Sequence, residues 1–420
     1  MTTTTHPTPV QWTDSKRYLW PLGALIMLLP ITGTVGYQLT GWAGMLWMGF
    51  FVLYGLIPLA DKLMGEDNAN PPDAVMAKLG ADRYYRWALY LSVPIYIGMW
   101  FYMAWFAMNH AMPWYGLLGM VASLGVGCGL AINIGHELGH QTAPLERFLA
   151  KLVLAPGCYG HFYVEHNRGH HLRVATPEDP ASSRFGETFY EFFPRCVIGS
   201  FKSAWQIEAK RLAREGKSVW HWSNDNLQSW AMTAAFWAAI TVWLGWPALL
   251  LVAIAGAYGG SLLEVVNYLE HYGLMRQQRS DGSYERCQPH HSWNSNHVVT
   301  NVLLYHLQRH SDHHANPTRS YQTLRHFDGT PRLCGDDSHR LPAAAVVPAD
   351  GPEGGCAPSR RHGQGQHQAL DTRSGDCKIF SRAGLKFPVT LAAPVWARLD
   401  LRALKHIRNP VHEKVALPRV

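Results

Sequence analysis

Histidine is frequent in this chain and is concentrated in four short segments. The sequence has 420 residues, of which 23 are histidine. The first segment, His-Glu-Leu-Gly-His, occupies residues 136–140, where a helix would place both imidazoles on one face because residues four apart are neighbours there. Imidazole is the commonest side-chain metal ligand, so this spacing predicts a metal site.

Three further segments extend this pattern. In residues 165–171, Glu-His-Asn-Arg-Gly-His-His, the pair His166 and His170 is again four apart, and we expect both rings to point to one place. The third segment contributes one histidine at the end of an apolar run, and in the fourth, residues 309–314, histidines are three and four apart. The candidate ligands are His136, His140, His166, His170, His171, His271, His310, His313 and His314.

Nine imidazoles exceed what one metal ion can bind. A structural zinc site takes four ligands and a catalytic one takes three plus water, whereas two five- or six-coordinate irons can bind nine imidazoles and keep positions for oxygen. We therefore predict two iron ions. Isolated histidines such as His161, His290 and His291 lack such a pattern and are expected to be ordinary polar side chains.

A carboxylate adjoins a histidine in every segment. An imidazole ligand usually donates its second N–H to a carboxylate or a carbonyl, which fixes its tautomer and increases its basicity. We expect this supporting role for the carboxylates, and direct ligation of the metal is the alternative. The four carboxylates are Glu137, Glu165, Glu270 and Asp312.

Long apolar runs must position these segments. The six runs are 18–39, 42–60, 87–108, 114–134, 229–244 and 246–268. Most approach the roughly 20 residues that a helix needs to cross a bilayer. No Lys or Arg occurs in residues 18–61, 87–146 or 218–275, which excludes an ordinary soluble core. The pattern predicts an all-α integral membrane protein with six transmembrane helices.

Charge placement predicts the orientation of these helices. The short loops near Gly41, 110–113 and Gly245 carry no Lys or Arg, so the positive-inside rule places them outside and both termini in the cytosol. The histidine segments then form a helical cap on the cytosolic side of the inner membrane. The net charge of +7 favours anionic lipid and acidic protein partners on that side, and no feature indicates nucleic acid.

Segments 133–140, 165–184, 267–276 and 307–325 together resemble the membrane-bound alkane 1-monooxygenases of the integral membrane fatty acid desaturase and hydroxylase superfamily. The tract Ala-Thr-Pro-Glu-Asp-Pro-Ala at 175–181 adds to the match. The resemblance implies a non-haem di-iron centre bound by the nine histidines above, dioxygen as oxidant, and electrons supplied by a reductase through rubredoxin. It implies that medium- to long-chain n-alkanes are hydroxylated to 1-alkanols.

The resemblance defines three regions. A cytosolic tail, residues 1–17, contains no removable signal peptide and precedes the di-iron hydroxylase domain at 18–333. Residues 334–420 depart from the family, and their Gly- and Pro-rich first half has no apolar periodicity. This composition predicts a divergent, disordered tail, and a shifted reading frame would produce it equally well.

Substrate selection must come from an apolar channel, because a saturated chain has no polar group to recognise. The resemblance places Leu53, in the second span, at a channel-facing position that limits depth, although packing against lipid is an equally good interpretation. Other functions remain open. A fatty acid desaturase or hydroxylase and a xylene-type monooxygenase use the same iron centre. A membrane zinc protease would explain residues 136–140 alone, and a metal transporter would place its ligands at membrane depth.

Overall fold

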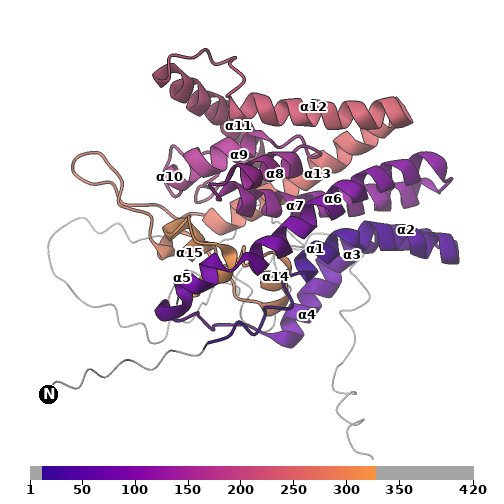
Figure 1. Cartoon of the computed structure of the whole chain (residues 1–420), viewed down its shortest axis with the longest axis horizontal. Helices are drawn as coiled ribbons and strands as arrows, with labels where there is room; N and C mark the ends of the chain where they lie inside the picture. Colours follow the sequence, from indigo (N-terminus) through magenta and orange to yellow (C-terminus); the bar gives the residue numbers. More distant parts are fainter. Residues whose placement is uncertain (1–11, 328–420) are drawn as a thin grey trace, which may run out of the picture. The chain divides into compact units, whose positions relative to one another are not determined.

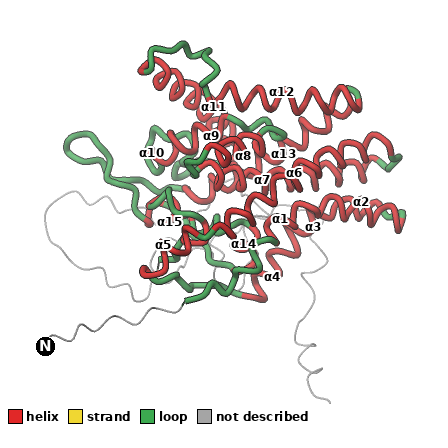
Figure 2. Tube along the Cα trace, viewed as in Figure 1, coloured by secondary structure: helices red, strands yellow, loops and turns green. Residues whose placement is uncertain are grey.

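The computed structural model describes residues 12–327, which lie within the first of two compact units, residues 1–360. The predicted tail at 334–420 lies outside the described residues, as do residues 1–11. Over residues 12–327 the structure is helical, and extended pairing there is limited to two isolated bridges (Figure 2). The all-α prediction is therefore confirmed for this part of the chain.

Six helical segments are long and apolar enough to cross a membrane, as predicted. The first, Leu22–Thr40, contains α1 (Leu22–Leu25), a 3-10 turn (Ile26–Leu28) and α2 (Leu29–Thr40). The second, Ala43–Met64, contains a 3-10 turn (Ala43–Trp47), α3 (Met48–Phe51), a π-helical turn (Val52–Leu56) and α4 (Ile57–Met64). The others are α6 (Arg83–Asn109), α7 (Trp114–Gly139), α12 (Asp225–Leu244) and α13 (Trp246–His271). Large apolar side chains on these spans face outward, for example Val242, which is 87% exposed. A lipid environment would cover them.

The spans differ from the predicted runs mainly at the end that carries the histidines. Helix α7 continues to Gly139 rather than 134, and α13 continues to His271 rather than 268. Polar residues such as Glu137 and Glu270 end an apolar run without ending a helix. The first and third ligand segments, which contain His136 and His271, are therefore held on rigid helix ends.

Helix α7 is the most buried span and packs directly on α13. A Cβ atom at Gly125 would lie 2.9 Å from the carbonyl oxygen of Ala255, and one at Gly259 would lie 3.0 Å from that of Gly125. Glycines at these positions let the two helices approach closely, as small residues do in membrane helix pairs. The close contact brings the ends of α7 and α13 together.

The remaining helices cover that end of the spans, opposite the short loops at Gly41, 110–113 and Gly245 (Figure 1). They are α5 (Asp73–Ala81), α8 (Pro144–Leu154), α9 (His161–Glu165), α10 (His171–Arg173), α11 (Phe189–Arg214), α14 (Val298–Leu303) and α15 (His310–Ala315). Helix α11 begins with a capping box in which Thr188 and Glu191 bond each other's backbone amides.

Candidate metal centre

The nine candidate ligands come together in two groups at this end of the spans. The five-histidine group contains His136, His140, His166, His171 and His313, and the four-histidine group contains His170, His271, His310 and His314. Within each group the ligand nitrogen atoms lie within 4.8 Å of one another. Segments that are far apart in sequence thus meet in space.

A π-helical turn separates histidines that the sequence spacing grouped together. Residues 166–170 form this turn between α9 and α10, and its hydrogen bonds run from residue i to i+5. His166 therefore shares a face with His171, whereas His170 faces the four-histidine group. The expectation that His166 and His170 point to one place, which assumed α-helical geometry, was wrong.

Helix α15 lies between the groups and supplies both. His310 and His314 are four apart and face the four-histidine group, whereas His313 faces the other. The Nε2 atom of His313 lies 2.8 Å from that of His136 and 3.1 Å from that of His171. One short helix therefore fixes the two groups relative to each other.

The distances between ring nitrogens fit metal coordination. In the four-histidine group, Nε2 of His310 lies 2.9 Å from that of His314 and 3.2 Å from that of His271. Two ligands at right angles on one cation, each bound at roughly 2.1 Å, are about 3.0 Å apart. A neutral imidazole nitrogen has one proton or one lone pair, so it cannot satisfy two such neighbours unless a cation joins them. The residues present therefore fit two metal ions.

Burial keeps the rings neutral, which metal binding requires. Burial lowers the pKa of His140 to about 3 and that of His310 to about 3, and the nearby His170 ring adds to both shifts. Burial followed by neighbouring rings holds the pKa of His313 and His314 well below the usual imidazole value. At neutral pH these nitrogens offer lone pairs.

The four predicted carboxylates have different partners. Glu270 Oε2 lies 3.2 Å from Nε2 of His310, and Glu137 Oε1 lies 3.7 Å from Nδ1 of His136. The other two pair with arginines: Glu165 accepts from Arg173 at 2.6 Å, and Asp312 accepts from Arg319 at 2.6 and 2.8 Å. Of these four carboxylates, Glu270 and Glu137 make the contacts with ligand rings described here.

Residue spacing did not reveal Asp179, which contacts a ligand directly. Its Oδ2 atom accepts hydrogen bonds from Nδ1 of His170 at 2.8 Å and from the Ser182 hydroxyl at 2.6 Å. Burial raises the pKa of Asp179, but the His170 ring and these hydrogen bonds outweigh burial and hold it below the usual value. A carboxylate on Nδ1 leaves Nε2 of His170 for a metal. The tract 175–181 was the available signal, because it contains this residue.

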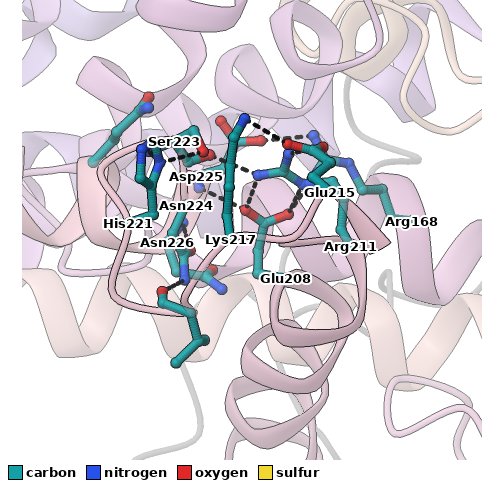
Figure 3. A network of polar contacts seen from close by, with 12 residues as sticks. Arg168, Glu208, Arg211, Glu215, Lys217, His221, Ser223, Asn224, Asp225 and Asn226 are labelled. Carbon is teal, nitrogen blue, oxygen red and sulfur yellow. Dashed lines mark hydrogen bonds and ion pairs between the residues drawn. The ribbon is translucent and has the colours of Figure 1, made fainter. Parts of the chain in front are cut away.

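Arg168 lies between the ligands His166 and His170 in the π-helical turn and anchors this turn to other helices (Figure 3). Its guanidinium donates to Glu208 of α11 at 2.5 Å and to Asp225, the first residue of α12, at 2.6 Å. Glu208 is fully buried and also accepts from the Asp225 amide and from Arg211. The turn is thereby tied to the start of the fifth span.

A third group, Glu285, His290 and His291, lies apart from the nine ligands. Nδ1 of His291 accepts a hydrogen bond from the Gln288 amide at 2.9 Å, so its proton is on Nε2, which lies 3.2 Å from Glu285. Both ring nitrogens are engaged. These contacts favour the ordinary polar role expected for His291.

Leu53 lies in the π-helical turn of the second span and packs, half-buried, against the core. The next residue, Tyr54, is hydrogen-bonded to Tyr258 of α13 at 3.1 Å between the hydroxyl groups. The turn therefore contacts the sixth span. Its part in selecting substrate stays a prediction.

Comparison with known proteins identifies the family. Residues 111–328 match the fatty acid desaturase family. The chain is 48% identical over 324 residues to alkane 1-monooxygenase 1 of Alcanivorax borkumensis, covering 77% of this chain and 80% of that one. The chain belongs to the alkane 1-monooxygenase family. The alkane 1-monooxygenase of Pseudomonas putida is 46% identical over 323 residues, with the same coverage.

A monooxygenase of another name is a more distant relative. The xylene/toluene monooxygenase hydroxylase component of Pseudomonas putida is 29% identical over 334 residues, covering 76% of this chain and 82% of that one. The higher identities confirm the resemblance to the alkane 1-monooxygenases. Membership leaves the zinc protease and the metal transporter without support.

Proposed function

We propose that this protein is a membrane-bound monooxygenase that hydroxylates the terminal methyl group of medium- to long-chain n-alkanes. Each turnover would convert one alkane, one dioxygen, two electrons and two protons into a 1-alkanol and water. The observation that carries the proposal is the pair of imidazole groups, with seven of the nine rings buried, at one end of the membrane helices. Membership of the alkane 1-monooxygenase family supports the substrate class.

We infer that each group holds one iron ion. When bound, the two irons supply the activation of dioxygen and the transfer of one oxygen atom to a C–H bond. The chain's own residues hold and orient the ligands: α7 and α13 present theirs on rigid ends, and Asp179 keeps a proton on Nδ1 of His170. Burial of the rings excludes bulk water from the reaction.

We infer that the substrate enters from the bilayer, in which a saturated chain already dissolves. Each methylene buried in an apolar path contributes about 0.8 kcal/mol, so the length of that path would select the chain. Electrons would come from rubredoxin and its reductase. The histidine groups would lie on the cytosolic side of the inner membrane. The family resemblance and the short loops without Lys or Arg support these assignments.

The test is reconstituted turnover. Membranes containing the protein, with rubredoxin, its reductase, NADH and a mixture of linear alkanes, should form 1-alkanols that carry label from ¹⁸O₂. Elemental analysis should find iron, which His313→Ala should lower while abolishing product. His290→Ala, outside both groups, is the matched control. Unsaturated fatty acids as product, or zinc in active protein, would contradict the proposal.

A further inference from the structure

Helix α11 is not one of the six spans, yet it exposes a continuous apolar stripe. Its members Tyr190, Pro194, Ile198, Phe201 and Trp205 are three or four apart and therefore share one face. Tyr190 is 70% exposed and Ile198 is 54% exposed. The opposite face is buried against the protein, so packing within the chain does not explain why apolar side chains such as Tyr190 and Ile198 face outward.

The stripe continues into the fifth span. The Phe201 ring stacks on Trp230 of α12 with centroids 5.2 Å apart, and the Trp205 ring stacks on the same residue at 5.8 Å. Trp205 also contacts Trp220, in the loop between the two helices, at 5.1 Å. The side chains of Phe201, Trp205, Trp220 and Trp230, which we call the aromatic ledge, therefore form a continuous surface from α12, which crosses the bilayer, to α11.

Basic residues flank this ledge. Lys202 and Lys210 are exposed on the adjoining face of α11, and Arg214 and Lys217 are exposed at its end. In the loop that follows, Trp220 is 71% exposed and Trp222 is 66% exposed. An apolar face with aromatic residues beside lysines and arginines is typical of helices that lie in the interface between anionic lipid and water.

We propose that α11 is an interfacial membrane helix, with the stripe from Tyr190 to Trp205 and the loop residues Trp220 and Trp222 inserted among lipid headgroups and upper acyl chains. The stripe would contact the bilayer that α12 crosses, because the aromatic ledge is continuous with that span. Phospholipid with a net negative charge would contact the flanking basic residues. This inference does not depend on the proposed catalytic function.

The buried side of the same helix supports the metal centre. Arg195 donates to the carbonyl oxygen of Pro180, next to Asp179, at 3.1 Å, and Glu208 binds Arg168 of the π-helical turn. A Cβ atom at Gly199 would lie 2.7 Å from that of Pro180, so α11 presses closely on this tract. Lipid on one face and ligand-bearing segments on the other make α11 the link between the membrane surface and both histidine groups.

The test measures whether each face of α11 is exposed to water or to lipid. Ile198→Cys, Trp222→Cys and, as the matched control on the polar face, Gln206→Cys would each be placed in vesicles of phosphatidylcholine and phosphatidylglycerol. Labelling by a charged, water-soluble maleimide, located by peptide mass spectrometry and normalised to the unfolded chain, should be about ten-fold slower at 198 and 222 than at 206. A lipophilic pyrenyl maleimide should reverse that order.

Three results would overturn the proposal. The first is equal labelling by the charged reagent at all three positions. The second is protection at 198 and 222 that disappears when the protein is diluted in excess lipid, because a second copy would then cover the stripe. The third is protection that requires an added electron-carrier protein. Iron content and thermal unfolding of each variant would verify that it is folded.

Discussion

The five-histidine and four-histidine groups share the segments at 165–171 and 309–314 but differ in the carboxylates beside their rings. The larger group has one more imidazole, and the carboxylate nearest its rings, Glu137, stays 3.7 Å from His136. The smaller group has Asp179 hydrogen-bonded to His170 and Glu270 beside His310. Closer carboxylate contacts thus accompany the smaller number of ligands. If each group holds one metal ion, as we propose, the two positions should differ in affinity and depend on different supporting residues.

Removing a ligand from either group should have the largest effect. His313→Ala and His314→Ala each delete a ring that contacts others in its own group, so each should lower bound iron from two to about one per chain and abolish product. Elemental analysis of purified protein measures the first result. If either variant kept both irons, the assignment of that ring to its group would be wrong.

Asp179→Asn should discriminate between the groups. The amide cannot fix the His170 tautomer as a carboxylate does, and loss of such a partner typically costs 10- to 100-fold in metal affinity. Competition with a chelator should release about half of the iron early while the rest resembles wild type. Glu137→Gln, beside the other group, is the comparison variant, and identical release curves for the two would remove the contrast.

Arg168→Ala should affect both groups equally, because the turn that it anchors carries His166 and His170 and leads directly into His171. The change leaves Glu208 and Asp225 with fewer cationic partners, although Arg211 and Lys151 still bind them. We expect a loss of about 2 kcal/mol in unfolding free energy, since breaking a buried pair costs more and this arginine is partly exposed.

Arg168→Lys is the control for that experiment, since it keeps the charge but cannot bridge both carboxylates. It should fall between wild type and Arg168→Ala in thermal unfolding measured in detergent. Selective loss of one metal in either variant would show that the turn does not serve the two groups jointly.

Lowering the pH should destabilise the folded protein through both histidine groups alike. The pKa of His140 in one and of His310 in the other is about 3, whereas an unfolded imidazole has a pKa of about 6.5. Between these values the unfolded chain binds more protons than the folded one, so stability is complete above about 6.5 and decreases as pH falls. Thermal unfolding of metal-free protein between pH 7 and 4 should show this decline, and a flat profile would contradict it.

The contrast between the groups could not be obtained from the sequence, although much of the site could. The helix that carries His136 and His140 follows from an apolar run that continues into a polar turn. The π-helical turn does not follow, because the contacts that anchor it are made with other helices, from Arg168 to carboxylates 40 and 57 positions away. Asp179 joins His170 through a loop, where neither helical nor strand spacing applies.

The smallest expected effect lies away from both groups, in the second span. If Leu53 lines the substrate path, Leu53→Trp should leave iron content unchanged and shift the products toward shorter alkanols. Each methylene that can no longer be buried should lower kcat/KM by about four-fold, which corresponds to about 0.8 kcal/mol. Leu56→Trp in the same turn is the matched control, because Leu56 is 58% exposed and faces outward. Product profiles across a chain-length series measure the shift, and equal profiles for the two variants would place Leu53 against lipid.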